Sequence, residues 1–256
     1  MLRGTAHLVL VGSPTPVPFF AWPGKPNWIV PEDCRIHVLA TPTEDGLGAL
    51  RSLAEDVRAA GDVSACYPDQ RPPLPTGAIT PEKVWRALAA LMPENAVVSD
   101  EGVTSSRDAE TWTVGAPPHD WLNVTGGSMG QGLPVATGAA LACPGRKVFA
   151  MESDGAGMYT LQALWTQARE RLDVVTVIFA NRAYKILRGE LAQMGIAEPG
   201  PKAAAVLDLE NPTLNWVKLA EGLGVPGSRA GSCEEFSDQL RDAIRHPGPR
   251  LIEVTL

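Results

Sequence analysis

Cysteine and histidine are scarce in this chain, and neither is spaced for metal binding. The 256 residues include four cysteines and four histidines, with no C-x-x-C and no H-x-x-x-H pattern. Structural zinc sites usually show such close spacings. We therefore expect no zinc site, and we expect the thiols to be reduced and structural. The cysteines are Cys34, Cys66, Cys143 and Cys233.

Basic tracts and long apolar runs are also missing. The formal net charge is −7, so nucleic acid and anionic membranes are not expected partners. The stretch Gly4–Gly24 has no charged residue, but its prolines would break a spanning helix. Its continuous apolar part, Leu8–Val11, is shorter than the core of about 7–15 residues in a signal peptide. We expect a soluble, cytoplasmic protein.

What the chain does contain is an alternation of short apolar strands with helices. Such alternation predicts an α/β fold, with a parallel sheet covered by helices on both faces. We expect a buried strand at 7–11 and further strands at 35–40, 96–99, 147–151, 174–179 and 250–255. We expect helices at 46–60, 80–91, 133–142, 160–171, 216–222 and 236–245.

A proline-rich stretch divides the chain. Residues 67–77 read YPDQRPPLPTG, which is typical of a linker. After it, Thr80-Pro81 provides an N-cap residue followed by a proline at the first helical position. We therefore expect one domain over residues 1–66, a linker over 67–79 and a second domain over 80–256.

Polar residues follow two of the expected strands. Asp154 and Asn181 each come just after a strand end, and they are separated by the length of one β-α-β unit. The carboxyl ends of parallel strands form the ligand crevice in such sheets, so the two tips should be neighbours. Carboxylate and amide oxygens suit Mg²⁺ bound to a phosphate group. Turn chemistry alone is the alternative, because Asp-Gly and Asn are common after strands.

Small residues surround Asp154. The stretch ESDGAGMY has no bulky side chain between Asp154 and Met158, which suggests that a diphosphate–metal group needs the space. On this interpretation Asp154 would lie at an exposed strand tip, and its replacement by alanine would leave the fold largely intact.

A second glycine-rich stretch reads TGGSMGQGLP at residues 125–134. The order G-x-G-x-x-G of dinucleotide-binding sites is absent from it, as is a P-loop elsewhere, so a nucleotide site is a weaker hypothesis. Its one large apolar residue is Met129, which could simply belong to the core.

Together, TGGSMGQGLPVATGAALA, ESDGAGMYTLQALWTQARE and VIFANRAY resemble the diphosphate-binding domain of thiamine diphosphate enzymes. The resemblance covers about residues 80–256 and is nearest to the benzoylformate decarboxylase and acetolactate synthase large subunit family. The family signature is G-D-G followed after roughly 25–30 residues by N-N. Here Ser153 and Ala180 replace the first glycine and the first asparagine.

The resemblance implies thiamine diphosphate and Mg²⁺ as cofactors. It implies that Asp154, the Asn181 side chain and the Ala183 carbonyl bind the metal, and that Met129 lies under the thiazolium ring of a bent cofactor. It further implies the following cofactor-binding residues: Gly102, Val103, Thr104, Gly127, Ser128, Met129, Ser153, Asp154, Gly155, Ala156, Asn181, Ala183 and Tyr184.

The same resemblance bears on what the chain could do. Residues 1–66 resemble only part of the family's central domain, and the pyrimidine-binding domain that supplies a glutamate to the cofactor has no counterpart. Glu101, Glu152 and Glu190 are expected to be solvated or structural. The resemblance implies C–C bond cleavage or formation on 2-oxo acids, as a lyase or a transferase, with a pyrimidine-domain partner. The alternative is a non-catalytic remnant or structural subunit.

A last expectation concerns residues 19–22. They read FFAW and suggest either an apolar substrate side or packing in a core or an oligomer. Together with the cofactor surface, this apolar cluster suggests a homodimer or a higher oligomer.

Overall fold

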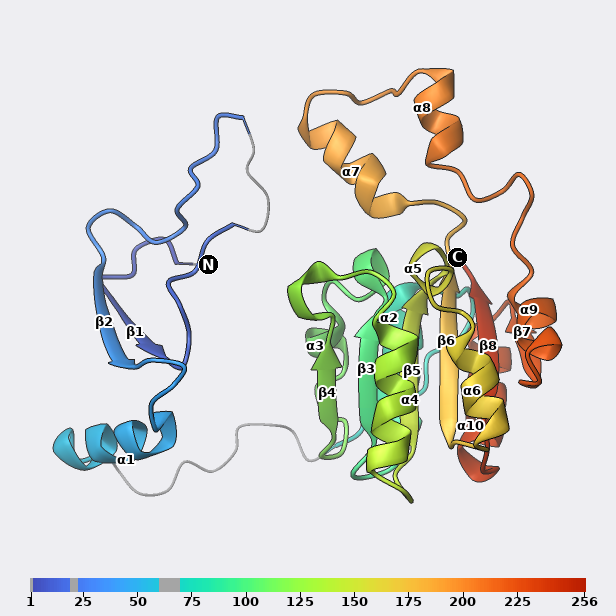
Figure 1. Cartoon of the computed structure of the whole chain (residues 1–256), viewed down its shortest axis with the longest axis horizontal. Helices are drawn as coiled ribbons and strands as arrows, with labels where there is room; N and C mark the ends of the chain where they lie inside the picture. The colour runs from blue at the N-terminus through green and yellow to red at the C-terminus, as the bar shows by residue number, and fades with distance from the viewer. Residues whose placement is uncertain (1, 19–22, 60–69) are drawn as a thin grey trace. The chain divides into compact units, whose positions relative to one another are not determined.

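The computed structural model describes residues 2–18, 23–59 and 70–256 (Figure 1). The expectations for residues 19–22, for Cys66 and for the start of the linker lie outside the described residues. The chain divides into two compact units, Met1–Cys66 and Tyr67–Leu256, and each is described by itself. Among the described residues, no helix is long and apolar enough to cross a membrane.

The first unit holds a small parallel sheet. Strand β1 (His7–Val11) pairs with β2 (Arg35–Ala40), and helix α1 (Gly46–Asp56) follows, capped by the Asp45 side chain, which accepts from the Gly48 N–H. The prediction of a buried first strand is wrong: only Leu10 is buried, and Val9 is 48% exposed. Two strands and one helix offer too little apolar surface to cover both faces of the sheet.

The second unit is built on a six-stranded sheet with the order β4-β3-β5-β6-β8-β7, and every pair in it is parallel. Figure 1 shows it with the carboxyl ends of the strands upward. The strands are β3 (Val97–Glu101), β4 (Asp120–Asn123), β5 (Val148–Ser153), β6 (Val174–Ala180), β7 (Gly227–Ala230) and β8 (Arg250–Thr255).

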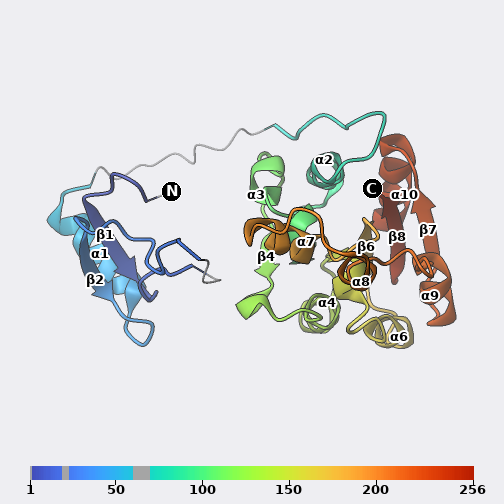
Figure 2. The same cartoon turned by 90° about the horizontal axis from the view of Figure 1, so that it is seen from above.

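Helices cover both faces of this sheet, as Figure 2 shows from above. One face carries α2 (Pro81–Leu91), α3 (Ala109–Trp112) and α10 (Cys233–Arg245), and the other carries α4 (Gly132–Ala142), α6 (Ala163–Arg169) and α9 (Trp216–Gly222). Strand β5 shows why two cores form: Phe149 and Met151 enter one core, while Val148 and Ala150 enter the other. The predicted parallel α/β sheet is confirmed.

The remaining α-helices of the second unit lie near the carboxyl ends of the strands. A short helix, α5 (Asp154–Gly157), follows β5 directly, and α7 (Lys185–Gln193) and α8 (Pro201–Val206) extend beyond the strand ends (Figure 1). Thr80 caps α2 as predicted, with its hydroxyl oxygen accepting from the Lys83 N–H. Helix α10 begins at Cys233, earlier than predicted, because Ser232 caps it by accepting from the Glu235 N–H.

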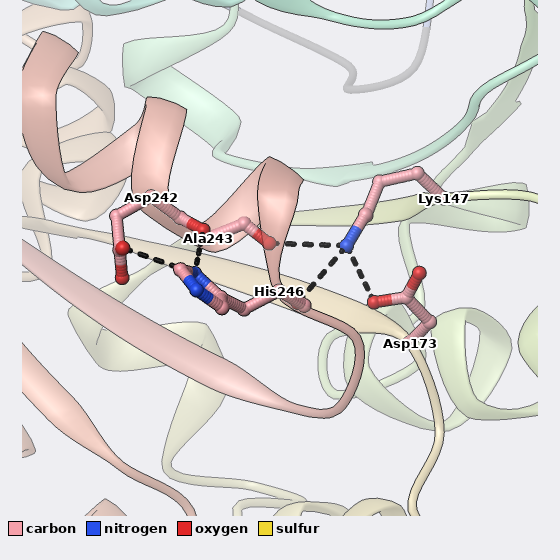
Figure 3. Close-up of polar contacts among 5 residues, drawn as sticks. All are labelled: Lys147, Asp173, Asp242, Ala243 and His246. Atoms are coloured by element: carbon pink, nitrogen blue, oxygen red, sulfur yellow. Dashed lines mark hydrogen bonds and ion pairs between the residues drawn. The ribbon is translucent and has the colours of Figure 1, made fainter.

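A buried lysine lies at the opposite end of the sheet, where the strands begin. Figure 3 shows the Lys147 ammonium donating to Asp173 Oδ1 at 2.5 Å and to the carbonyls of Ala243 and His246 at 3.0 and 3.4 Å. The two carbonyls belong to the end of α10, where a positive charge is favourable. Lys147 thereby joins the start of β5, the chain before β6 and the end of α10.

Candidate functional site

A cavity of about 160 Å³ lies at the carboxyl ends of β5 and β6. Four separate segments of the second unit contribute to it: the turn after β3, the glycine-rich loop before α4, the start of α5, and the chain from β6 into α7. The lining residues are Val103, Thr104, Met129, Ser153, Gly155, Ala156, Tyr159, Asn181, Ala183, Tyr184, Lys185, Ile186 and Leu187.

Most of the residues expected at the site meet in this cavity. Gly102, Gly127, Ser128 and Asp154 are the expected residues that do not line it. Sequence reasoning missed Tyr159, and it missed the run Lys185–Leu187. Tyr159 follows the expected residue Ala156 by three positions, and Lys185–Leu187 directly follows Tyr184 at the start of α7, so closeness to expected residues is the signal that could have included them.

Asp154 joins the ends of two neighbouring strands. Its Oδ1 accepts from the Gly155 N–H at 3.0 Å, and its Oδ2 accepts from the Arg182 N–H at 2.6 Å. The expectation of an exposed strand tip is wrong, because Asp154 is only 2% exposed. Burial raises the pKa of its carboxyl to about 6, although the hydrogen bonds from Arg182 and Gly155 act in the opposite direction.

Asn181 lies at the tip of the neighbouring strand, as the spacing predicted, since β5 pairs with β6 up to Ser153 and Phe179. Its Oδ1 accepts from the Ala183 N–H at 3.0 Å, and the Ala183 carbonyl accepts from the Lys185 N–H at 2.8 Å. Arg182 between them has a positive φ of 55°, and its N–H donates to Asp154 Oδ2.

The oxygens of this tip fit a hard cation. No group of three or more His, Cys, Asp or Glu side chains that could hold a metal occurs in the part of the chain that the structure describes. A metal here would therefore depend on the Asp154 carboxylate, the Asn181 amide and the Ala183 carbonyl. A carboxylate offers about four lone-pair sites, and two hydrogen bonds leave the others free. Mg²⁺ commonly takes one or two protein carboxylates and completes its shell with phosphate and water.

The glycines after Asp154 have a different cause from the one expected. A Cβ on Gly155 would lie 2.7 Å from Cε1 of Tyr184, and a Cβ on Gly157 would lie 2.8 Å from Cη2 of Trp216. Real Cβ atoms do not approach so closely. The space around these two glycines is thus filled by aromatic rings of the protein, and not by room left for a ligand alone.

The turn after β3 is held in a strained conformation. Val103 has a positive φ of 51°, which is rare for a β-branched residue. Asp100 accepts from the Gly102 N–H at 3.0 Å and from the Ser106 hydroxyl at 2.6 Å. Within the same turn, the Ser105 carbonyl accepts from Trp85 Nε1 at 2.9 Å. These bonds hold Val103 and Thr104 against the cavity.

Met129 belongs to the cavity and not to the core. Its side chain is 37% exposed and lines the cavity, whereas the core of this face is formed by residues such as Leu133 and Ala136.

Of the three glutamates expected to be solvated or structural, Glu101 and Glu152 are buried in the second unit and Glu190 is part of α7.

Burial and the neighbouring carboxyl of Glu101 raise the pKa of Glu152 well above its ordinary value.

Comparison with known proteins relates the site to one family. The family model described as "Thiamine pyrophosphate enzyme, C-terminal TPP binding domain" matches residues 103–254. IlvX of Mycobacterium tuberculosis, which carries the name of an acetolactate synthase large subunit, is 50% identical over 256 residues, which is 100% of this chain and 49% of that protein. Benzoylformate decarboxylase of Pseudomonas aeruginosa is 31% identical over 210 residues, covering 80% of this chain and 38% of the enzyme.

Solved structures give the same relationship. The thiamine diphosphate-dependent 4-hydroxybenzoylformate decarboxylase of Rhodococcus jostii superposes with a TM-score of 0.78 at 28% identity, over 99% of this chain and 49% of that one. A thiamine diphosphate-dependent enzyme of Mycobacterium smegmatis superposes with a TM-score of 0.71 at 26% identity, over 98% of this chain and 48% of that one. The chain spans about half the length of these relatives.

Proposed function

The chain belongs to the thiamine pyrophosphate enzyme family and carries its C-terminal cofactor-binding domain. From this premise, we propose that it binds Mg²⁺ and thiamine diphosphate at the cavity. We further propose that it takes part in C–C bond cleavage or formation on 2-oxo acids. The family uses thiamine diphosphate together with a divalent metal such as Mg²⁺. When bound, the cofactor supplies an electron-accepting ring to a reaction beside a carbonyl group.

One observation carries the proposal. Segments far apart in the sequence bring Thr104, Met129, Ala156 and Asn181 to one cavity at the carboxyl ends of the strands. This is the place where open α/β sheets bind their ligands. The cavity is lined by a few polar groups among mostly apolar side chains, which is typical of a cofactor site.

Each side of the cavity has its own proposed role. Asp154, Asn181 and the Ala183 carbonyl would hold the metal. The diphosphate would be held by the turn of Gly102, Val103 and Thr104 and by the chain at Ser153, Gly155, Ala156 and Tyr184. Gly127, Ser128 and Met129 would lie along the organic part of the cofactor, with Met129 forcing its bent shape.

The remainder of the active site would come from a partner. Because the chain spans about half the length of its relatives, we propose that it works with a polypeptide carrying the pyrimidine-binding domain, or in an oligomer that includes one. The alternative is a non-catalytic subunit of the same fold. The departures at Ser153 and Ala180 favour that alternative.

Calorimetric titration tests the cofactor site directly. We expect thiamine diphosphate to bind with Mg²⁺ present and to bind at least about tenfold more weakly in a chelator, because Asp154, Asn181 and the Ala183 carbonyl would hold the metal that offsets the charge of the diphosphate. ADP serves as the matched diphosphate control and is expected to bind more weakly. Equal binding of ADP would indicate a general phosphate site. No metal-dependent binding, with or without a pyrimidine-domain chain, would contradict the proposal.

A further inference from the structure

The last two residues of β3 reach opposite faces of the sheet and anchor two different walls of the cavity. Neighbouring side chains of a strand point to opposite faces. Asp100 accepts from Gly102 and Ser106 in the turn that carries Val103. Glu101 accepts from two main-chain N–H groups of the glycine-rich loop, Gly130 at 2.5 Å and Gly132 at 2.7 Å.

Glu101 uses both carboxylate oxygens for this loop. Its Oε1 receives the bond from Gly130 and its Oε2 the bond from Gly132. The side chain is only 1% exposed, so these charge-assisted bonds do not compete with water. The Gly130 amide follows Met129 directly and the Gly132 amide follows two residues later, so the carboxylate holds the chain next to the side chain that lines the cavity.

Other bonds support the same segment. The Thr160 hydroxyl donates to the Gly130 carbonyl at 2.7 Å. Gln131 Nε2 donates to the carbonyls of Thr125 and Ser128 at 2.8 and 3.3 Å. The main chain on both sides of Met129 is therefore bonded, while the Met129 side chain itself remains 37% exposed in the cavity.

A second buried carboxyl lies beside Glu101 on the neighbouring strand. Glu152 is the register partner of Glu101 across β3 and β5, is 0% exposed, and accepts no hydrogen bond from the loop amides of the described residues. A Cβ on Gly132 would overlap Oε1 of Glu152 and would lie 2.8 Å from Oε2 of Glu101. The loop backbone therefore packs directly against both carboxyl groups, and Glu101 is the one whose oxygens hold its amides.

We propose that Glu101 is a positioning residue that holds the loop Thr125–Gly132 so that Met129 faces the cofactor. The inference rests on the proposed function of the cavity. It gives two adjacent residues different roles. Glu101 positions the loop beside the organic part of the cofactor, and Asp100 positions the turn beside its diphosphate.

The test compares Glu101→Gln with Asp100→Ala. Glu101→Gln keeps the size of the side chain and removes one of the two acceptor oxygens that hold the loop amides. Gly102 and Ser106 both donate to Oδ1 of Asp100, which an asparagine oxygen could replace, so alanine is needed to remove both bonds in the turn. In the cofactor-free chain, we expect Glu101→Gln to speed hydrogen exchange at Gly130 and Gly132 by at least tenfold, while Asp100→Ala leaves these amides unchanged. This readout does not depend on the cofactor, so it still tests the anchor if the proposed function fails.

Ligand affinities then distinguish the role of Glu101 from that of Asp100. With Mg²⁺ present, we expect Glu101→Gln to weaken thiamine diphosphate binding about tenfold and to leave inorganic pyrophosphate binding unchanged, whereas Asp100→Ala weakens the binding of both. Unchanged exchange at Gly130 and Gly132, or an equal loss of both ligands in Glu101→Gln, would overturn the inference.

A milder variant covers the case in which Glu101→Gln does not fold. Thr160→Val removes the bond to the Gly130 carbonyl and keeps the side-chain shape. We expect it to speed exchange at Gly130 and to weaken thiamine diphosphate more than pyrophosphate, by smaller factors. An equal loss of both ligands would again count against the inference.

Discussion

At the scale of single residues, Asp154 combines two duties that are usually separate. Its carboxylate accepts from Gly155 and Arg182 and so fastens the end of β5 to the turn after β6. The same oxygens are the proposed ligands of Mg²⁺. A change at this position should therefore affect binding and stability together, and the two effects can be separated by the choice of substitution.

We expect Asp154→Asn to weaken metal-dependent binding of thiamine diphosphate by more than about 100-fold, since even partners outside the ligand shell contribute about 10–100-fold. Asp154→Ala should lose binding as well. It should also lower the free energy of unfolding by about 1–3 kcal/mol, because buried N–H groups lose their acceptors. Calorimetry and urea unfolding measure the two effects.

Asp238→Ala is the matched control for Asp154→Ala. Its side chain is 78% exposed and pairs with Arg241 on the same helix. We expect unchanged binding and a change in unfolding free energy within about 0.5 kcal/mol. Normal cofactor binding by Asp154→Asn would mean that the ligand assignment is wrong.

Residue types and spacing were enough to predict that Asp154 and Asn181 are neighbours, whereas Met129 was assigned to the same site only through the family resemblance. They were not enough to predict burial. Whether Asp154 is exposed depends on Arg182 and Tyr184 folding back over the strand end, which is a tertiary effect. The same holds for Gly155, since nothing local indicates that the ring of Tyr184 occupies the place of its side chain.

At the scale of elements, the start of β5 and the end of α10 are joined by one buried ammonium group, that of Lys147. Lys147 has a side chain only 7% exposed, and its donors reach Asp173 and the last carbonyls of α10. A lysine so placed contributes to stability only while its partners remain in position.

We expect Lys147→Met to lower the free energy of unfolding by about 2–4 kcal/mol, somewhat less than the loss of a fully buried pair, because Asp173 can still reach water. Urea unfolding gives the change, and hydrogen exchange should increase at the end of α10. The control is Arg86→Met, which breaks an exposed pair with Glu82 and should change stability by less than about 1 kcal/mol. Equal midpoints for the two variants would contradict this role of Lys147.

In the second unit, the elements that the sequence predicted have buried apolar faces, such as β6, whose seven residues are all buried. The missed strands β4 and β7 are edge strands, and β4 is mostly exposed. The missed helices α7 and α8 contain no buried residue. Without a buried face these segments lack the periodicity from which a helix or strand is recognised.

At the scale of the whole molecule, the alternation of strands and helices predicted a parallel sheet, but it did not predict the order β4-β3-β5-β6-β8-β7. Alternation does not determine which strands are neighbours. It also does not show that β3, β4 and β5 lie on one side of β6 in the sheet and that β7 and β8 lie on the other. That order places β5 and β6 in the middle, so both cores bury them and the cavity opens at their ends.

The chain matches about half the length of its relatives. If a pyrimidine-domain chain completes the active site, as proposed, turnover depends on that second polypeptide. The first unit, considered alone, leaves apolar side chains of its sheet exposed, with Val9 at 48% and Val38 at 60%. Exposed apolar surface of this kind is typical of an interaction face. We expect the chain alone to bind the cofactor but not to consume pyruvate or benzoylformate at a measurable rate.

Mixing it with the half of IlvX that it does not match should produce turnover and tighten cofactor binding. Asp154→Asn in the same mixture should abolish both effects, which ties any activity to this cavity. Turnover by the chain alone would show that no partner is required. Cofactor binding without turnover in the mixture would instead support a non-catalytic subunit, because the site would be intact and only the chemistry absent.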